Sequence, residues 1–287
     1  MASRPRSGYA SRVKKSALQS GSPGPFRAEH LRSGDPYELS NGHPIHCLPT
    51  GPRGAKAANV GGGVLASDPA VHDVGVDTGF SPSPEILRAP DLSVGEFPDQ
   101  PGWVQGAPPL AVEYADTGQD EADLRIKIQE LFAAGTLYIW VVRLTGPRRV
   151  EVHEPGGKLR IAHPGDQLEA PGILANPVPV EALYDREAGR RVTLRNLLQR
   201  EGYASLDDVR AEGEAQGRAE GEVQGRAEGE VQGLREAVVE VLTGRSLGVD
   251  DDLRTALARV DDPAVLRSAL RRAAVAAPAE ILAVLRN

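Results

Sequence analysis

Residues 110–142 read LAVEYADTGQDEADLRIKIQELFAAGTLYIWVV. The two ends of this stretch, Leu110–Tyr114 and Leu137–Val142, are short apolar runs of the kind that form strands. Between them, Glu121–Ala134 repeats its Leu and Ile side chains at helical spacing, and Gly135 is suited to end that helix. A strand, a helix and a strand in this order predict a mixed sheet with at least one crossover connection.

Further short apolar runs lie on both sides of this unit and are also predicted to be strands. They are Val74–Phe80, Leu92–Val94, Val150–His153 and Leu159–Ala162. Pro155-Gly156-Gly157 separates the last two as a hairpin turn. The three consecutive glycines in Asn59–Val64 make a helix doubtful there. Residues 35–185 are therefore expected to form one α/β (α+β) domain, a mixed sheet with flanking helices.

The composition is that of a soluble globular protein. Of 287 residues, 40% are hydrophobic and 25% are charged, and the formal net charge is -7. The longest uninterrupted apolar run, Leu137–Val142, is too short to span a bilayer, so no membrane partner is expected. The single cysteine, Cys47, excludes an internal disulfide framework and favours a cytoplasmic location.

Residues 1–34 form a basic N-terminal arm that is rich in Ser, Gly and Pro. The arm contains seven Arg or Lys residues and one acid, Glu29, although the chain as a whole is acidic. It has neither helical nor strand periodicity, so it is predicted to be disordered. It could contact the phosphates of a polyanion, or it could be a solvated extension without a partner.

The second half of the chain contains an internal repeat of eight residues. It runs through Ala211–Arg218, Ala219–Arg226 and Ala227–Leu234, with glycine at every fourth position. Six glycines in a helix cost roughly 6 kcal/mol relative to alanine, so an isolated helix here is marginal. The repeat is then either a flexible spacer or a face of small residues on which another helix packs. We favour self-association through residues 211–234 as a long helix or coiled coil.

Residues 186–234 thus form a linker that leads into the repeat helix, and residues 235–287 form a small helical tail. Ser205 with Asp208 predicts a helix start in the linker. Asp262-Pro263 and Pro278 predict two further helix starts in the tail. No residue pattern in the tail indicates chemistry.

Two acids and one lysine around the predicted sheet are suited to metal-assisted phosphodiester hydrolysis. Asp91 stands at the head of one strand and Glu113 late in the next, so their carboxylates can lie side by side. Carboxylate oxygens are preferred ligands of Mg²⁺ and Mn²⁺. Lys127 on the following helix can position a water molecule or offset developing charge. A carboxylate in the apolar strand of Glu113 is costly to bury unless it is paired or metal-bound.

The order of these motifs resembles the Uma-type restriction endonucleases, a bacterial branch of the PD-(D/E)XK nuclease superfamily. The shared elements are Pro90-Asp91, then apolar residues followed by Glu113, then a helix ending in Ala-Ala-Gly135, then the strand Tyr138–Val142. Tyr37–Gly42 also resembles the Tyr-Glu-Leu-Ile-Asp-Gly opening of that family. The resemblance covers about residues 35–185 and implies a restriction-endonuclease-like fold.

The resemblance also implies roles for individual residues. Asp91 and Glu113 would hold Mg²⁺ or Mn²⁺, with the Tyr114 carbonyl as a third ligand. Glu38 would be an additional acid near the pocket. The superfamily lysine two residues after the second acid is replaced here by an alanine. In the Uma-type branch the lysine lies on the following helix, which makes Lys127 the catalytic candidate.

The sequence thus predicts a Mg²⁺- or Mn²⁺-dependent DNA endonuclease that acts as a dimer or larger assembly. The alternative is a degenerate nuclease fold that serves as a scaffold or binding subunit. A nucleotide-binding enzyme is disfavoured, because Gly61–Gly63 is not followed by the Lys-Ser/Thr of a phosphate loop. His43, His46 and Cys47 are not expected to bind metal, because no second pair of ligands stands at zinc-like spacing.

Overall fold

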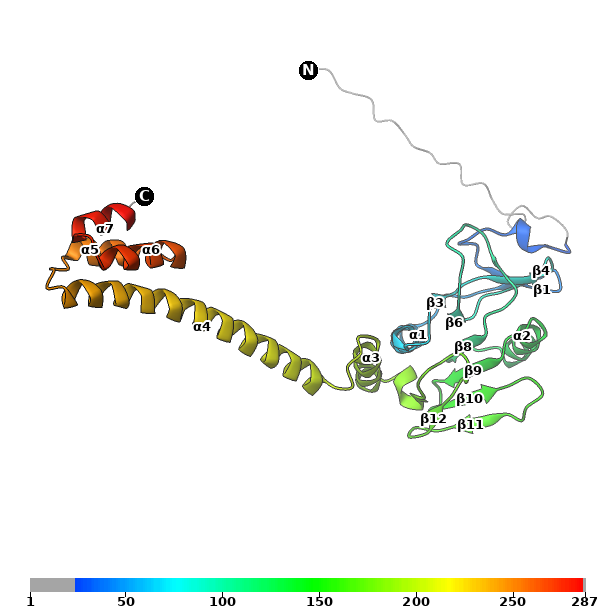
Figure 1. Ribbon diagram of the computed structural model, residues 1–287. Coiled ribbons are helices and arrows are strands. Elements are labelled where there is room, and N and C mark those ends of the chain that lie inside the picture. The colour runs from blue at the N-terminus through cyan, green and yellow to red at the C-terminus, as the bar shows by residue number, and fades with distance from the viewer. Residues whose placement is uncertain (1–23, 286–287) are drawn as a thin grey trace, which may run out of the picture. The chain divides into compact units, whose positions relative to one another are not determined.

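The computed structural model describes residues 24–285, and these form two compact units. The first unit ends at Ala204 and the second begins at Ser205. The first unit is a mixed α/β structure and the second is helical (Figure 1). No helix in the described part of the chain is both long and apolar enough to cross a membrane.

A six-stranded mixed sheet forms the centre of the first unit, in the order β11-β10-β9-β8-β6-β3. Its strands are β3 (Asp73–Val76), β6 (Leu92–Gly95), β8 (Leu110–Ala115), β9 (Tyr138–Arg143), β10 (Arg149–His153) and β11 (Arg160–Ala162). Neighbouring strands are antiparallel except β8 and β9, which are parallel because α2 (Glu121–Ala133) connects them as a crossover. The predicted strand–helix–strand unit and its mixed sheet are confirmed.

A second, five-stranded sheet has the order β2-β1-β5-β4-β7. Its strands are β1 (Tyr37–Ser40), β2 (His43–His46), β4 (Phe80–Ser83), β5 (Ile86–Arg88) and β7 (Val104–Gln105). A separate pair is formed by β12 (Gln167–Leu168) and β13 (Val178–Pro179). The single strand predicted over Val74–Phe80 is wrong in extent. Asp77 adopts a left-handed backbone with φ of 49°, so the chain leaves β3 and enters the other sheet at β4.

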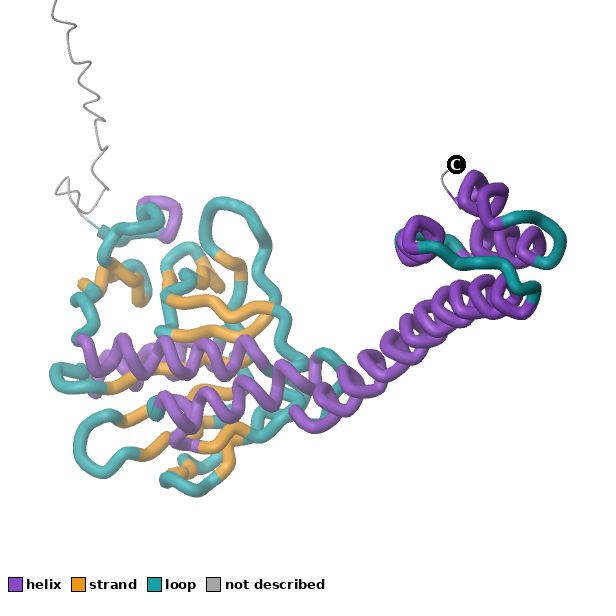
Figure 2. Tube along the Cα trace, turned by 90° about the vertical axis from the view of Figure 1, so that its left-hand side faces the viewer, coloured by secondary structure: helices purple, strands orange, loops and turns teal. Residues whose placement is uncertain are grey.

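Helices cover both faces of the six-stranded sheet. On one face, α2 packs against alternate side chains of β8 and β9, which are Ala111, Ala115, Ile139 and Val141. On the other face lie α1 (Pro52–Ser67), α3 (Arg186–Arg200) and the short turn η2 (Val180–Leu183). The helices α1 and α3 run side by side (Figure 2). The large core of the unit lies between them and the sheet.

Helix α1 passes through three consecutive glycines, where the sequence made a helix doubtful. A side chain at Gly61 would overlap the hydroxyl group of Tyr114 and would lie 3.3 Å from the carbonyl oxygen of Leu183. A side chain at Gly62 would lie 3.3 Å from Leu92. Close approach of the helix to the sheet therefore requires small residues at these two positions, and the packing offsets their helix cost.

The part of the N-terminal arm that the structure describes is not disordered, so that prediction is wrong for Phe26–Leu31. Phe26, Ala28 and Leu31 are buried against Leu39 and Leu87 of the five-stranded sheet. Ala28–His30 forms the 3₁₀ turn η1. Local periodicity could not reveal this, because the three apolar side chains are buried by strands that follow later in the chain. Residues 1–23 lie outside the described residues.

The second unit consists of the long helix α4 and three short helices. Their bounds are α4 (Leu206–Gly244), α5 (Asp251–Ala258), α6 (Pro263–Ala273) and α7 (Pro278–Leu285). The predicted helix starts are confirmed: Ser205 and Asp208 form a capping box, and Asp262 caps α6. The short helices pack on the C-terminal part of α4 around Val238 and Leu242. The repeat residues 211–230 are all exposed.

Candidate active site

Asp91 and Glu113 lie on neighbouring chain segments. Strands β6 and β8 are antiparallel with Leu92 opposite Val112, which places Asp91, the residue before β6, next to Glu113. Asp91 Oδ2 accepts a hydrogen bond of 2.6 Å from the backbone N–H of Tyr114. The N–H and C=O of one strand residue point to the same side of the strand. The Tyr114 carbonyl therefore points to the side on which Asp91 lies.

Lys127 reaches this position from α2. Its Nζ lies 2.7 Å from Glu113 Oε1 and 3.0 Å from Glu38 Oε1. The same ammonium donates a hydrogen bond of 2.8 Å to the carbonyl oxygen of Ala89. The structure thus brings Glu38, Glu113 and Lys127 into direct contact, with Asp91 beside Glu113. The four predicted side chains form one cluster, drawn from β1, β8, α2 and the segment before β6.

Two charged residues that the sequence did not single out complete this cluster. Arg88 is only 2% exposed, and its Nη1 lies 2.9 Å from Glu38 Oε2 while its Nε lies 2.5 Å from Glu130 Oε2. Ser40 Oγ donates a hydrogen bond of 2.6 Å to Glu130 Oε1. Glu38 therefore contacts two cations, Arg88 and Lys127. Through these contacts the five-stranded sheet is tied to α2.

Burial and neighbouring charges set the protonation of the cluster. Burial raises the pKa of Glu113 to about 8, with Lys127 opposing the rise. Burial also raises the pKa of Asp91, and Lys127 again offsets part of the effect. For Glu38, the effect of burial is outweighed by Lys127 and Arg88, so its pKa is lowered. Burial alone would lower the pKa of Lys127, but the surrounding carboxylates raise it and the ammonium stays charged.

The cluster contains more acids than bases, and this surplus fits a divalent cation. Glu38 and Glu130 pair with Arg88, and Glu38 also contacts Lys127. Asp91 and Glu113 are the two carboxyl groups of this cluster whose pKa is raised, and burial also raises the pKa of the nearby Asp77. Magnesium sites commonly use one or two carboxylates and complete their shell with other oxygens. Within residues 24–285 no three His, Cys, Asp or Glu side chains are placed so that they could hold a metal ion together.

The first unit thus has a mixed sheet with acids on adjacent segments and a lysine on the crossover helix. The chain belongs to the Uma2 family, described as "Putative restriction endonuclease", whose model matches residues 26–178. The predicted family and the mixed α/β class are therefore confirmed.

Among solved structures, the crystal structure of "a putative nuclease belonging to DUF820" from Anabaena variabilis is similar to this chain. The two chains are 16% identical with a TM-score of 0.47, and the match covers 56% of this chain and 99% of the other. No curated protein matches the chain.

Proposed function

We propose that this protein is a Mg²⁺- or Mn²⁺-dependent endonuclease that hydrolyses phosphodiester bonds in DNA. The observation that carries the proposal is the position of the Lys127 ammonium, 2.7 Å from a buried Glu113 that stands next to Asp91. Membership of a family described as restriction endonucleases supports DNA as the substrate. The single, exposed Cys47 is compatible with a reducing cytoplasm, where we expect the protein to act.

Each residue of the cluster has a distinct part in this proposal. Asp91, Glu113 and the Tyr114 carbonyl would hold the divalent cation, which when bound supplies Lewis-acid stabilisation of charge on the phosphate. Lys127 offers a charged N–H to an oxygen of the reacting phosphate or to the attacking water. Glu38, whose Oε1 lies 3.0 Å from Lys127 Nζ, helps to hold that ammonium in place. Because Lys127 stays protonated, it acts as a hydrogen-bond donor and a positive charge rather than as a base.

Supercoiled plasmid DNA tests the proposal. With Mg²⁺ or Mn²⁺ we expect the wild type to produce nicked circles, and EDTA to abolish the product. Asp91→Ala should lower the nicking rate by at least about a hundredfold, an effect typical of losing a group that stabilises transition-state charge. Glu154→Ala, which removes an exposed acid from the loop after β10, is the matched control and should cleave like the wild type. Equal activity of the wild type and Asp91→Ala, or none in either, would favour the scaffold alternative.

We further propose that the protein self-associates through the repeat at residues 211–234. Its side chains are exposed up to residue 230, and an added Cβ at each repeat glycine would meet no atom within 4 Å apart from its own helix backbone. Six helical glycines cost roughly 6 kcal/mol relative to alanine. Within the described residues, Gln216, Gln224 and Gln232 each donate a hydrogen bond to a glutamate one turn later, and at about 0.2–0.5 kcal/mol per pair these offset only a small part of the cost. Close packing of a second copy against these small residues would offset it.

A further inference from the structure

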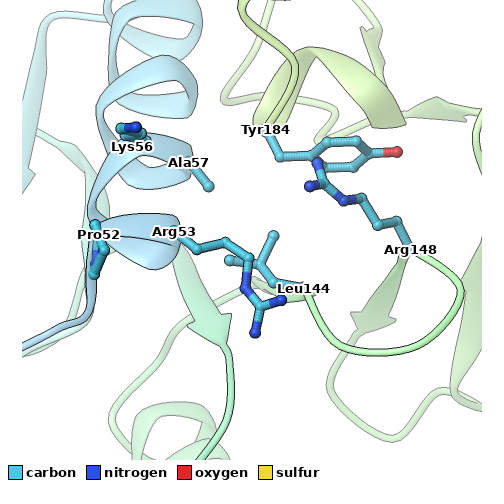
Figure 3. A pocket seen from close by; sticks show the side chains of 7 residues that line it. All are labelled: Pro52, Arg53, Lys56, Ala57, Leu144, Arg148 and Tyr184. Atoms are coloured by element: carbon cyan, nitrogen blue, oxygen red, sulfur yellow. The ribbon is translucent and has the colours of Figure 1, made fainter.

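A pocket outside the acid cluster lies at the N-terminal end of α1, on the α1 side of the six-stranded sheet (Figure 3). The pocket has a volume of about 380 Å³. Ala57 and Leu144 are its buried lining residues, and Arg53, Lys56 and Arg148 line it with positive charge. Three cations around one hollow of this size suit an anionic group rather than an apolar ligand.

The charged side chains that line this pocket are all cations, and within the described residues only one of them, Arg53, is paired with an acid. Asp116 accepts both a 2.9 Å hydrogen bond from Arg53 Nε and a shorter one from Arg53 Nη2. Arg148 lies over the ring of Tyr184, 4.6 Å from its centroid. Lys56 forms no ion pair with any residue of the described chain. Lys56 and Arg148 are therefore the two cations not neutralised by an acid, and both are exposed.

Two further acids near Tyr184, Glu181 and Asp185, do not line the pocket, and both accept hydrogen bonds from backbone N–H groups. Glu181 Oε2 accepts a hydrogen bond of 3.0 Å from the N–H of Gly165. Asp185 accepts hydrogen bonds of 3.1 and 2.9 Å from the first-turn N–H groups of α3. The first turn of α1 adds to the positive potential, because its N-cap Gly51 has no side chain to satisfy the N–H groups there.

The pocket is separate from the acid cluster but lies at the end of the same strand. Glu113 contacts α2, whereas Tyr114 donates its hydroxyl hydrogen to Leu183 on the α1 side, so the pocket and the acids face opposite sides of the sheet. Asp116, which holds Arg53, follows Glu113 by three residues, about 10 Å along an extended strand. Phosphates of one duplex strand recur about every 3.4 Å along the helix axis. The pocket therefore lies near the end of the strand that carries Glu113, on the other face of the sheet.

We propose that this pocket binds a backbone phosphate of the nucleic acid whose scissile bond reaches Asp91 and Glu113. The inference rests on the proposed function, because it assigns both sites to one ligand. Phosphate contacts from Lys and Arg supply most of the sequence-independent affinity for DNA and fix its position on the protein. The chain as a whole is acidic, so a local positive site of this kind is needed for a polyanion to bind. Arg148 and Lys56 are the phosphate-binding residues, with Arg53 held ready by Asp116.

Binding to a fluorescein-labelled 20-base-pair DNA duplex, measured by anisotropy in EDTA, tests this inference without requiring cleavage. The full-length variant carrying Lys56→Gln and Arg148→Gln should bind at least about tenfold more weakly than the wild type. Its plot of log K against log salt should be shallower by about 1 to 2, since each lost phosphate contact removes about 0.9 from the slope. The matched control carries Lys158→Gln and Arg160→Gln, which remove two exposed cations from the β10–β11 hairpin. This control should bind like the wild type.

Equal weakening by both double variants would overturn the inference, because net charge alone would then explain the loss. If the Lys56→Gln, Arg148→Gln variant loses binding of adenosine monophosphate but binds the duplex like the wild type, the assignment to nucleic acid is overturned. If the Lys56→Gln, Arg148→Gln variant binds DNA more weakly as expected, but the wild type does not nick plasmid, this inference stands while the proposed nuclease function fails. Circular dichroism of all variants should match, because the four substituted side chains are exposed.

Discussion

Glu113 is a carboxyl group in a buried strand, and its environment makes cation binding depend on pH. Burial raises its pKa to about 8, so below that pH the folded protein holds a proton there. A cation must displace this proton, and affinity for Mn²⁺ should therefore rise by up to about tenfold per pH unit until about pH 8 and then level off. Isothermal titration calorimetry at pH 6, 7 and 8 measures this dependence.

The same titration in Glu113→Gln provides the control for the pH dependence. The amide cannot be deprotonated, so the pH dependence should become shallower and the affinity lower throughout. A wild-type affinity that is constant from pH 6 to pH 8 would show that Glu113 carries no proton to be displaced. It would also contradict its assignment as a cation ligand.

Replacing either of two nearby glycines of α1, Gly61 and Gly63, with alanine should change the free energy of unfolding in opposite directions. A Cβ at Gly61 would overlap the Tyr114 hydroxyl and disturb its 3.0 Å hydrogen bond to Leu183, so Gly61→Ala should lower the free energy of unfolding by about 1–3 kcal/mol. Gly63 is exposed and an added Cβ would meet nothing within 4 Å, so Gly63→Ala should raise it by about 0.5–1 kcal/mol. Urea denaturation followed by circular dichroism compares the two. Destabilisation of equal size in both variants would contradict the packing argument.

The sequence was most informative where neighbouring residues determine structure. Asp91, Glu113 and Lys127 could be proposed because an apolar strand with one acid and a helix with one lysine are visible in a short stretch. Arg88 and Glu130 could not be proposed from the sequence, because their contacts depend on how β1 and β5 pair and on where α2 crosses the sheet. The roles of all these residues in catalysis stay predictions.

At the scale of elements, the sequence succeeded with capped helices and apolar strands and failed with the five-stranded sheet. The helix starts at Ser205, Asp262 and Pro278 follow from side chains that act locally. Strands such as β2 and β4 contain Pro44 and Pro82 and are only four residues long, so no period of two could be recognised. For α1, tertiary contacts override a local preference against helix, and single-sequence reasoning does not include them.

The repeat part of α4 makes a separate prediction about assembly. Val223 is 72% exposed among the Ala and Val residues that recur at every fourth position of the repeat, about half a turn from Gly221 and Gly225. Val223→Glu should therefore leave α4 folded but disfavour packing of a second helix on that Ala/Val side of the repeat. In sedimentation equilibrium we expect the wild type to associate and Val223→Glu to shift toward the monomer. Arg226→Gln changes the net charge by the same amount at another exposed position and should associate like the wild type. A wild type that is monomeric at all concentrations would identify the repeat as a spacer.

At the scale of the whole molecule, the chain divides between Ala204 and Ser205 into units that each have their own core. The candidate active site draws every residue from the first unit. A chain that ends at Ala204 should therefore unfold cooperatively in a thermal scan followed by circular dichroism. It should also keep metal-dependent nicking of supercoiled plasmid at a rate within about threefold of the full chain, because it lacks none of the acids, lysine or pocket cations.

We expect the second unit to affect whether one or both strands of the DNA duplex are cut, and not the rate at which a single strand is cut. Two active sites brought together by the repeat can cut both strands of a duplex, which converts supercoiled plasmid directly to linear DNA. A chain that stops at Ala204 should then give nicked circles and less linear DNA at early times than the full chain. The full chain that carries Val223→Glu should show the same change. A gel time course measures the ratio of linear to nicked DNA. An unchanged ratio in both proteins would show that association through the repeat plays no part in cleavage, whatever oligomer forms in solution.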